Sequence, residues 1–316
     1  MALPPRKERT RRSLLLIAAL YTLWLRCTWQ AKQRLSSWGP RWVAHVIMSP
    51  LPKLAAALGI SAEAARLDGV DAPALAAIGP CVVTISPHGL GVGHTMLTGP
   101  ALLTPPLDAL QPIGGVAASA VFAVPLWREL LLLFGWREAS PGLAERMLRA
   151  GQSVVVVPGG IHEMVETTHE QDALRLQPNL GFVRLALRCG RPLLPIYAFG
   201  ETQLLQSTEA LLRARRWLAD RLRVGLPLAT GRGGLPFPFA APLPVKHRIV
   251  VGRPVPPSGP PCAEPSEEIV LELYSRWCGE MRRLFAAHAH EVLPAAVAAR
   301  GLLISCGGEA GPRSRL

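Results

Sequence analysis

The sequence of 316 residues has little charge, no regular cysteine pattern and no long uninterrupted apolar run. Asp, Glu, Lys and Arg make up 18% of the chain against 49% apolar residues, which excludes a disordered or fibrous protein. The mean hydropathy of +0.25 is high for a soluble domain, but no apolar run reaches the ~18–20 residues of a transmembrane helix. This pattern excludes a multi-spanning protein and is compatible with a short anchor. The six cysteines form no CxxC pair, so we expect reduced thiols in a cytosol-facing protein.

Two common catalytic motifs are also missing. The sequence contains neither GxSxG nor GxxxxGK[ST], which disfavours an α/β-hydrolase and a P-loop enzyme. The histidine pairs His88/His94 and His162/His169 do not have the spacing of a strong zinc motif, and no cysteine or aspartate completes a ligand set. We therefore predict no metal.

The net charge of +12 is concentrated at the N-terminus. Residues 1–41 carry nine basic side chains and one acidic one, Glu8, and these basic residues flank the apolar run Leu14–Leu25. Tryptophans lie beside the run, at positions 24, 29, 38 and 42. A nucleic-acid-binding protein would spread its basic residues over a folded face with aromatic side chains between them. The observed pattern instead indicates a membrane interface and no nucleic-acid partner.

Three interpretations are open for residues 1–60. A retained membrane anchor is favoured, either as one span or as a hairpin, because a second apolar stretch, Trp42–Met48, follows a basic connection. Arg26 interrupts the first run after twelve residues, which makes it short for a full span. A signal peptide is disfavoured because Arg26-Cys27-Thr28-Trp29 offers no small-x-small cleavage site. A peripheral helix of the core is the third interpretation.

The chain beyond residue 60 alternates between apolar strand-like runs and helical patterns. We predict strands at 81–85, 115–124, 153–157, 193–199 and 246–252, and helices at 125–135, 140–151, 181–189 and 269–285. This alternation predicts an α/β fold, a largely parallel sheet flanked by helices, in a domain spanning 61–293. Residues 223–244 are rich in Gly and Pro and are predicted to form a surface loop. Residues 294–316 are predicted to form a loose tail.

Polar or glycine-rich segments follow three of the predicted strands. They are Ser86–His94, Pro158–Glu163 and Gly200-Glu201. In parallel sheets ligands bind beyond the carboxyl ends of the strands. A histidine such as His88 can act there as a general base, and Glu163 could orient its ring or stabilise its cation. Glycines allow backbone N–H groups to approach a phosphate or an oxyanion.

Six segments occur in an order that resembles the diacylglycerol acyltransferase family, which is shared with monoacylglycerol and wax-ester acyltransferases. The resemblance covers roughly residues 40–290. The segments are Ser86-Pro87-His88-Gly89, Pro125–Glu129, Pro158–Glu163, Asn179–Ala186, Pro195–Glu201 and Val251–Val255.

The resemblance implies transfer of an acyl group from acyl-CoA, as co-substrate, to a lipid hydroxyl, with diacylglycerol as the first choice of acceptor. It implies no cofactor, a membrane as partner and a catalytic domain on the cytosolic side of the endoplasmic reticulum; a homo-oligomer is left open. The residues that it marks as catalytic are His88 and Glu163. Those marked as substrate-binding are Ser86, Pro87, Gly89, Arg128, Gly159, Gly160, Gly181, Phe182 and Glu201.

The sequence departs from the family pattern at three places. Ser86 stands where the family has its first histidine, and Gly93 stands where related glycerol-phosphate acyltransferases carry an aspartate. Pro178-Asn179-Leu180 displaces the usual arginine before Gly-Phe. The alternatives are therefore a catalytically inactive membrane-binding relative, an enzyme using monoacylglycerol or a fatty alcohol, and a lipid hydrolase.

Overall fold

A central sheet of eight strands organises the protein. The computed structural model describes residues 6–36 and 38–306, and in it the strands follow the order β1-β11-β8-β3-β6-β4-β5, with β2 also paired to β11. All of these pairings are parallel except β8 with β11. The predicted largely parallel sheet is therefore confirmed. The strands are β1 (Ser61–Ala62), β2 (Arg66–Leu67), β3 (Val82–Ser86), β4 (Ile113–Ala117), β5 (Arg137–Glu138), β6 (Ser153–Val156), β8 (Leu193–Phe199) and β11 (Lys246–Val251).

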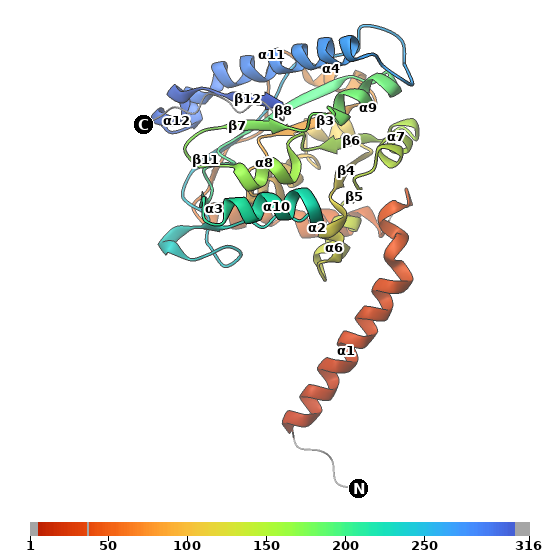
Figure 1. The fold of residues 1–316 in the computed structure, drawn as a ribbon, viewed down its shortest axis with the longest axis vertical. Coiled ribbons are helices and arrows are strands. Elements are labelled where there is room, and N and C mark those ends of the chain that lie inside the picture. Colours follow the sequence, from red (N-terminus) through yellow and green to blue (C-terminus); the bar gives the residue numbers. More distant parts are fainter. Residues whose placement is uncertain (1–5, 37, 307–316) are drawn as a thin grey trace.

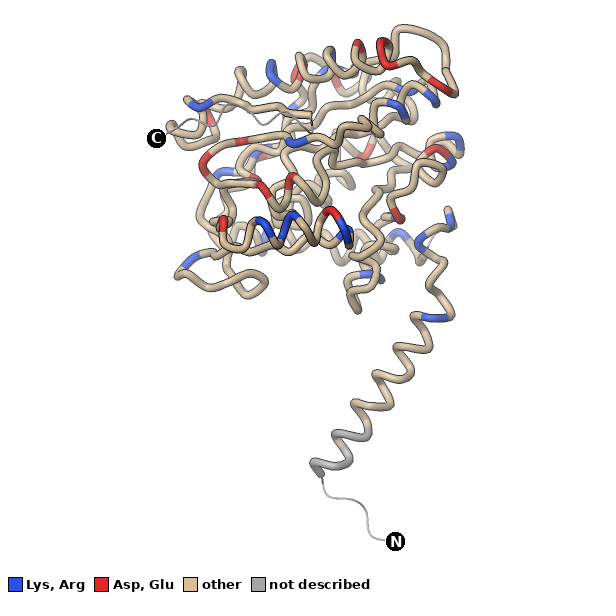
Figure 2. Tube along the Cα trace, in the orientation of Figure 1, with Lys and Arg blue, Asp and Glu red and all other residues tan. Residues whose placement is uncertain are grey.

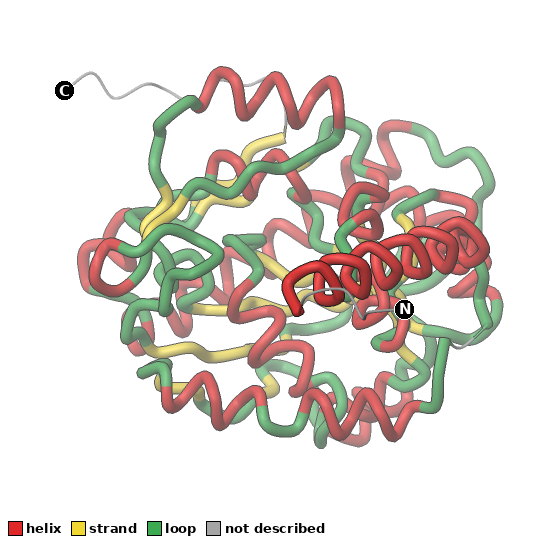
Figure 3. Tube along the Cα trace, turned by 90° about the horizontal axis from the view of Figure 1, so that it is seen from below, coloured by secondary structure: helices red, strands yellow, loops and turns green. Residues whose placement is uncertain are grey.

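Helices cover both faces of this sheet (Figures 1 and 3). Between residues 120 and 292 they are α6 (Trp127–Leu133), α7 (Pro141–Arg149), α8 (Gly160–Glu166), α9 (Gly181–Cys189), α10 (Leu212–Leu222) and α11 (Glu267–Val292). Earlier in the domain they are α2 (Arg41–Met48), α3 (Leu51–Ala57), α4 (Ala72–Ala77) and α5 (Gly99–Ala101). Single turns of other helix types are η1 (Trp29–Gln33), η2 (His94–Thr98), η3 (Leu107–Leu110), η4 (Ser119–Ala123) and η5 (Arg232–Gly234). Two small pairs of strands join β9 (Gln206–Ser207) to β10 (Ala229–Thr230) and β7 (Ala173–Leu176) to β12 (Leu303–Cys306).

Local sequence signals explain where several helices begin and end. The hydroxyl of Ser140 accepts a hydrogen bond from the backbone N–H of Leu143 and caps α7, as predicted. Gly190 ends α9 in the left-handed region, at φ +58°, which a glycine adopts without strain. The predicted strand at 115–124 is wrong in its second half, since β4 ends at Ala117. There the chain leaves the sheet and Phe122 packs in a cluster with α6.

The core forms on both faces of the sheet because side chains alternate along each strand. Val82, Val154 and Val156 pack on α9 and α11, whereas Val83, Ile85 and Val155 face the opposite layer. Trp277 of α11 is fully buried, and its Nε1–H donates to Oγ1 of Thr84 at 2.8 Å. Ile269 is 42% exposed, so the predicted apolar ladder of this helix begins only at Leu273.

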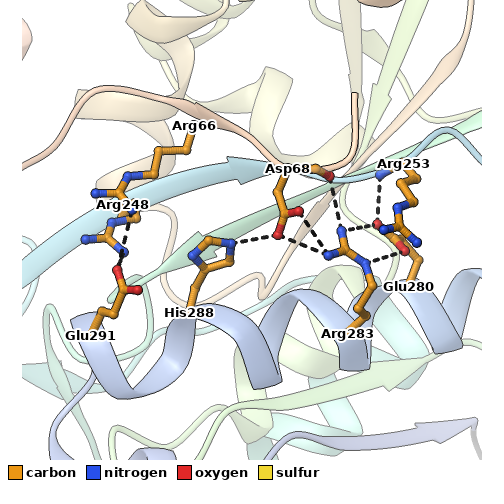
Figure 4. Close-up of polar contacts among 8 residues, drawn as sticks. All are labelled: Arg66, Asp68, Arg248, Arg253, Glu280, Arg283, His288 and Glu291. Carbon is orange, nitrogen blue, oxygen red and sulfur yellow. Dashed lines mark hydrogen bonds and ion pairs between the residues drawn. The ribbon is translucent and has the colours of Figure 1, made fainter. Parts of the chain in front are cut away.

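A polar network fastens α11 to the segment around β2. Arg283 donates to both carboxylate oxygens of Asp68, at 3.0 and 3.1 Å, and Nε2 of His288 lies 2.8 Å from Asp68 Oδ2 (Figure 4). Arg283 also donates to Glu280, which accepts the backbone N–H of Arg253. Asp68 therefore ties the N-terminal edge of the domain to its last long helix.

The helix α1 (Arg6–Thr28) projects away from the domain (Figure 1). Its middle stretch carries no charge (Figure 2), and the side chains of residues 14–17 are each 60–62% exposed. Residues Ser13–Gln33 are long and apolar enough to cross a membrane, and among the described residues no other helix passes that test. The helix continues through Arg26, because one charged side chain at a helix periphery breaks no backbone hydrogen bond, so the candidate span is longer than the apolar run Leu14–Leu25 alone. The structure describes the backbone of residues 6–12 as helix but not the basic side chains at 6, 7, 9, 11 and 12.

The base of α1 is held by the domain. Arg128 is fully buried, donates to the carbonyl and hydroxyl of Thr28, and pairs with Glu129 at 2.7 Å. Lys32 donates to Ser119 and Glu138 at 2.6 and 3.2 Å. The second predicted hairpin segment forms α2, whose Ala44 is buried while Trp42 is exposed. This segment therefore packs one face on the domain.

The expected loose tail is wrong for its first part. Residues Ala295–Arg300 form α12, and Val297 and Ala298 are buried. Residues Leu303–Cys306 form β12, which pairs in parallel with β7. Two buried apolar side chains are too few to give a periodic pattern in the sequence. Their burial in the core that contains α11 nevertheless stabilises the ordered conformation of this segment. Residues 307–316 lie outside the described part of the chain.

Candidate active site

Three parallel strands, β3, β6 and β8, end at the same edge of the sheet, as their neighbouring positions require. The segments after them bring His88, Glu163 and Glu201 to this edge. Glu163 and Glu201 are 1% and 2% exposed, and His88 is half-buried. The structure therefore places the predicted catalytic pair together, along with Glu201.

His88 has the geometry of a general base. Its Nδ1 lies 3.1 Å from the carbonyl oxygen of Gly89, an acceptor only, so Nδ1–H donates and the lone pair of the neutral ring resides on Nε2. Burial lowers the pKa of His88 to about 4, and the nearby His94 contributes to the lowering. The ring is therefore uncharged at neutral pH and can accept a proton through Nε2.

Glu163 contacts the backbone of His88, and the expected contact with its ring is wrong. The carboxylate accepts the backbone N–H of His88 through Oε1 and that of Arg175 through Oε2 at 3.1 Å. Burial raises the pKa of Glu163 to about 7, although the two amide groups act in the opposite direction. These bonds fix the loop that carries His88, which is the positioning that a base needs.

Gly159 and Gly160 have separate local roles. A Cβ atom on Gly159 would lie 1.9 Å from Oε2 of Glu163, so this glycine makes room for the buried carboxylate. Gly160 adopts φ +55°, and its N–H donates to the carbonyl of Val157 at 3.1 Å. The N–H of Gly160 is therefore already bonded in this structure, and an oxyanion or phosphate contact from the backbone near these glycines stays a prediction. Substrate binding at the two glycines stays a prediction.

Glu201 lies among histidines that the sequence did not single out together. Its Oε2 is 3.8 Å from Nδ1 of His94 and 3.7 Å from Nε2 of His247. Burial alone would raise the pKa of Glu201, but the two imidazoles outweigh it and hold the pKa below its usual value. The ring of His94 also donates through Nε2 to the carbonyl of Pro87 at 2.8 Å, which fixes the loop before His88.

The remaining predicted site residues fall into two groups. Ser86 and Pro87 are buried at the end of β3, directly before His88, and Gly89 holds the ring of His88. Arg128 lies at the base of α1, in the contacts described above. Phe182 packs edge-to-face on Trp277 in the core, with ring centroids 5.1 Å apart, and Gly181 begins α9. Arg128, Gly181 and Phe182 form this second group, and their contact with a substrate stays a prediction.

Two cavities lie beside this edge; one reaches His94 and the other His247, and His88 itself is in the lining of neither. The first, of about 320 Å³, extends from Ile85 and His94 to Met147, between α2 and β4. The second, of about 330 Å³, is bounded by α3, residues 62–65 and residues 97–105, with His247 in its wall. His45, Met48 and Leu103 line both cavities. Each is large enough for part of a lipid-sized ligand.

The order of the motifs along this fold agrees with a match to a family model. The model described as diacylglycerol acyltransferase matches residues 10–297. The chain belongs to the diacylglycerol acyltransferase family. Within it, the human 2-acylglycerol O-acyltransferase 3 is 33% identical over 194 residues, covering 57% of this chain and 54% of the relative. The diacylglycerol O-acyltransferase 2 of Dictyostelium discoideum is 28% identical over 176 residues, covering 53% and 52%.

A further relative is the mouse acyl-CoA wax alcohol acyltransferase 2, which is 30% identical over 227 residues, covering 66% of this chain and 65% of the relative. The chain spans about half the length of the human and Dictyostelium relatives. Among solved structures, the 1-acyl-sn-glycerophosphate acyltransferase PlsC from Thermotoga maritima gives a TM-score of 0.45 at 16% identity, covering 86% of this chain and 96% of that one.

One histidine of the site, His247, was not among the site residues predicted from the sequence. His247 was assigned only to a late strand, yet it reaches the site because β11 runs antiparallel to β8, with Arg248 opposite Phe199. The start of β11 therefore meets the end of β8. The apolar pattern of residues 246–252 predicts a strand but not whether it runs parallel or antiparallel to its neighbour.

Proposed function

We propose that this protein transfers an acyl group from acyl-CoA to a lipid hydroxyl, with diacylglycerol as acceptor and triacylglycerol as product. The observation that carries the proposal is a neutral, half-buried histidine with its free Nε2 at a sheet edge where His94 and His247 each line a neighbouring cavity. The relatives are named for diacylglycerol, 2-acylglycerol and wax alcohol, which supports a lipid alcohol as acceptor.

In the proposed reaction Nε2 of His88 takes the proton of the acceptor hydroxyl as its oxygen attacks the thioester carbonyl. The new C–O bond forms, the tetrahedral intermediate collapses and the C–S bond breaks. His88 then returns the proton to the sulfur of coenzyme A. Glu163 contributes by holding the backbone of His88 in place. No acyl-enzyme is required, because the thioester is already an activated acyl donor.

Two adjacent cavities suit a reaction between two lipids. The first reaches from His94 deep beneath β4, so we assign it to the acyl chain. The second has His247 in its wall, and we assign it to the acceptor. The shared wall of His45, Met48 and Leu103 would keep the two chains apart while their reactive ends meet at the strand ends.

We propose that α1 anchors the protein in the endoplasmic reticulum membrane with the domain on the cytosolic side. In Figure 1, α10, α6 and the loop after α10 lie on the side toward which α1 projects. Large apolar side chains are exposed there, with Leu126 at 72%, Trp217 at 57% and Phe239 at 82%. Exposed arginines of α10 surround Trp217, at positions 213, 216 and 221. Exposed Trp and Leu beside Arg is the composition of a helix at an anionic lipid surface.

The proposal is tested by expression in a yeast strain lacking neutral-lipid acyltransferases, with His88→Ala alongside. We expect triacylglycerol from the wild type and none from the variant. Wax or other esters alone would keep the chemistry and change the acceptor. Absence of every ester from membranes that contain the protein would refute acyl transfer and leave an inactive membrane-binding relative.

A further inference from the structure

The carboxylate of Glu201 is buried without a hydrogen bond. Both oxygens are inaccessible and unpartnered among the described residues, and the nearest basic nitrogens, on His94 and His247, are 3.8 and 3.7 Å from Oε2. Burying a charge costs free energy unless it is paired closely, so a group of this kind calls for an explanation. Glu163 offers a contrast, because its two oxygens are both hydrogen-bonded to the backbone.

Two glycines create the space that Glu201 fills. A Cβ atom on Gly89 would lie 2.6 Å from Cγ of Glu201, and one on Gly93 would lie 2.3 Å from Oε2. Gly93 has φ −66° and ψ −37°, an ordinary helical conformation that any residue adopts. The backbone therefore does not require glycine at position 93. A side chain there is excluded first by the carboxylate that β8 brings to the same place, and also by the ring of His247, whose Nε2 would lie 2.7 Å from the same Cβ atom.

We infer that Glu201 is a positioning residue whose buried negative charge balances the positive charge that His88 acquires when it takes the acceptor's proton. This role rests on the acyl transfer proposed above. Glu201 packs against Gly89, whose carbonyl holds the ring of His88. Glu163 makes its bonds to backbone groups and not to the ring.

The electrostatics agree with this geometry. Burial and His94 lower the pKa of His88, and Glu201 is the acidic side chain that acts in the opposite direction. Its charge therefore favours the protonated ring, which is the species formed during the reaction.

Because a side chain at 93 and the carboxylate of Glu201 compete for one space, the carboxylate can be supplied from either position. The experiment compares Glu201→Gln, Glu201→Ala, Gly93→Asp and the double variant Gly93→Asp/Glu201→Ala in the full chain, in membranes supplied with oleoyl-CoA and diacylglycerol. Glu264→Gln removes an exposed carboxylate and serves as the matched control. Thermal unfolding of each variant, followed by tryptophan fluorescence, reports folding independently of activity.

We expect Glu201→Gln, which keeps the size and removes the charge, to lower kcat about 100-fold with an unchanged KM for oleoyl-CoA. Gly93→Asp alone should lower the unfolding temperature, because its Cβ meets both Glu201 and His247, and the double variant removes the closer of these two contacts. The double variant should unfold at a higher temperature than Gly93→Asp, and its kcat should be at least about tenfold higher than that of Glu201→Ala. The control should match the wild type.

Three outcomes would overturn the inference. The first is full activity in Glu201→Gln. The second is a double variant that is folded but as inactive as Glu201→Ala, which would mean that a carboxylate at this place is not what the site needs. The third is a Gly93→Asp variant as stable with Glu201 as without it, which would remove the shared space. Failure of the proposed function itself is distinct, because the wild type would then transfer no acyl group.

Discussion

Replacing Glu163 by glutamine should change how the stability of the protein depends on pH. The folded state holds this carboxyl at a pKa of about 7, against 4.5 for an ordinary glutamate, because it is buried. Between these two values the folded state keeps a proton that the unfolded state has lost. Stability of the wild type should therefore fall as pH rises from about 4.5 through 7, by a total of roughly 3 kcal/mol from this group.

Glutamine cannot ionise, so Glu163→Gln lacks this fall. Its carbonyl oxygen can accept one of the two amide hydrogen bonds, to His88 or to Arg175, and the cost of losing the other does not vary with pH. The free energy of unfolding of the variant, relative to that of the wild type, should therefore rise by roughly 3 kcal/mol between pH 4.5 and 8. For a domain of this size that corresponds to roughly 5–10 °C in unfolding temperature.

The assay is thermal unfolding of both proteins in detergent at pH 5, 6, 7 and 8, followed by tryptophan fluorescence. The exposed Glu264→Gln serves as a control, and its difference from the wild type should stay constant with pH. A constant difference for Glu163→Gln as well would refute the reasoning, because Glu163 would then titrate in the folded state as it does in the unfolded chain.

Further predictions concern the cavities, the membrane and the network on α11. Ala44→Leu narrows the first cavity and should lower kcat/KM for long acyl chains more than for short ones. Ala101→Leu narrows the second cavity and should raise KM for the acceptor while leaving the acyl-chain-length profile unchanged. The same acyl-chain-length profile in both variants would contradict the assignment of the cavities. In vesicles of anionic lipids, brominated lipids should quench the fluorescence of the exposed Trp217, so Trp217→Phe should remove part of the quenched signal. Trp277 lies in the core, so Trp277→Phe should remove only signal that brominated lipids do not quench. Unchanged quenching in Trp217→Phe would exclude contact of α10 with lipid. Burial raises the pKa of Asp68, but hydrogen bonds from His288 and Arg283 outweigh it and lower the pKa overall, so Asp68→Asn should cost about 1–3 kcal/mol at pH 7 and less as pH falls through the folded pKa; urea unfolding at pH 7 and pH 2.5 measures this, and an equal cost at both would contradict it.

Elements with strong local signals were predictable from the sequence. The helix α9 begins and ends where Gly181 and Gly190 predict, and α7 begins at the Ser140 cap. The meeting of His88, Glu163 and Glu201 followed from three parallel strands ending at one edge. Spacing along the chain carries this information because parallel strands connected by helices place equivalent ends together.

Other features depend on contacts between distant segments, which no local pattern records. The antiparallel direction of β11 brings His247 beside Glu201, and the bond from Glu163 to the backbone of His88 depends on the exact approach of two loops. In the sequence, Gly93 stands where related glycerol-phosphate acyltransferases carry an aspartate. Only the structure shows that another carboxylate occupies the space beside it.

The central claim is that His88 takes the proton of a lipid hydroxyl during acyl transfer from acyl-CoA. The most direct measurement is kcat for transfer of labelled oleate from oleoyl-CoA to diacylglycerol by the purified full-length protein, for the wild type, His88→Gln and the exposed His290→Gln. We predict labelled triacylglycerol from the wild type and from His290→Gln, and a kcat about 10²–10⁴-fold lower for His88→Gln. Equal kcat for all three proteins would contradict the account.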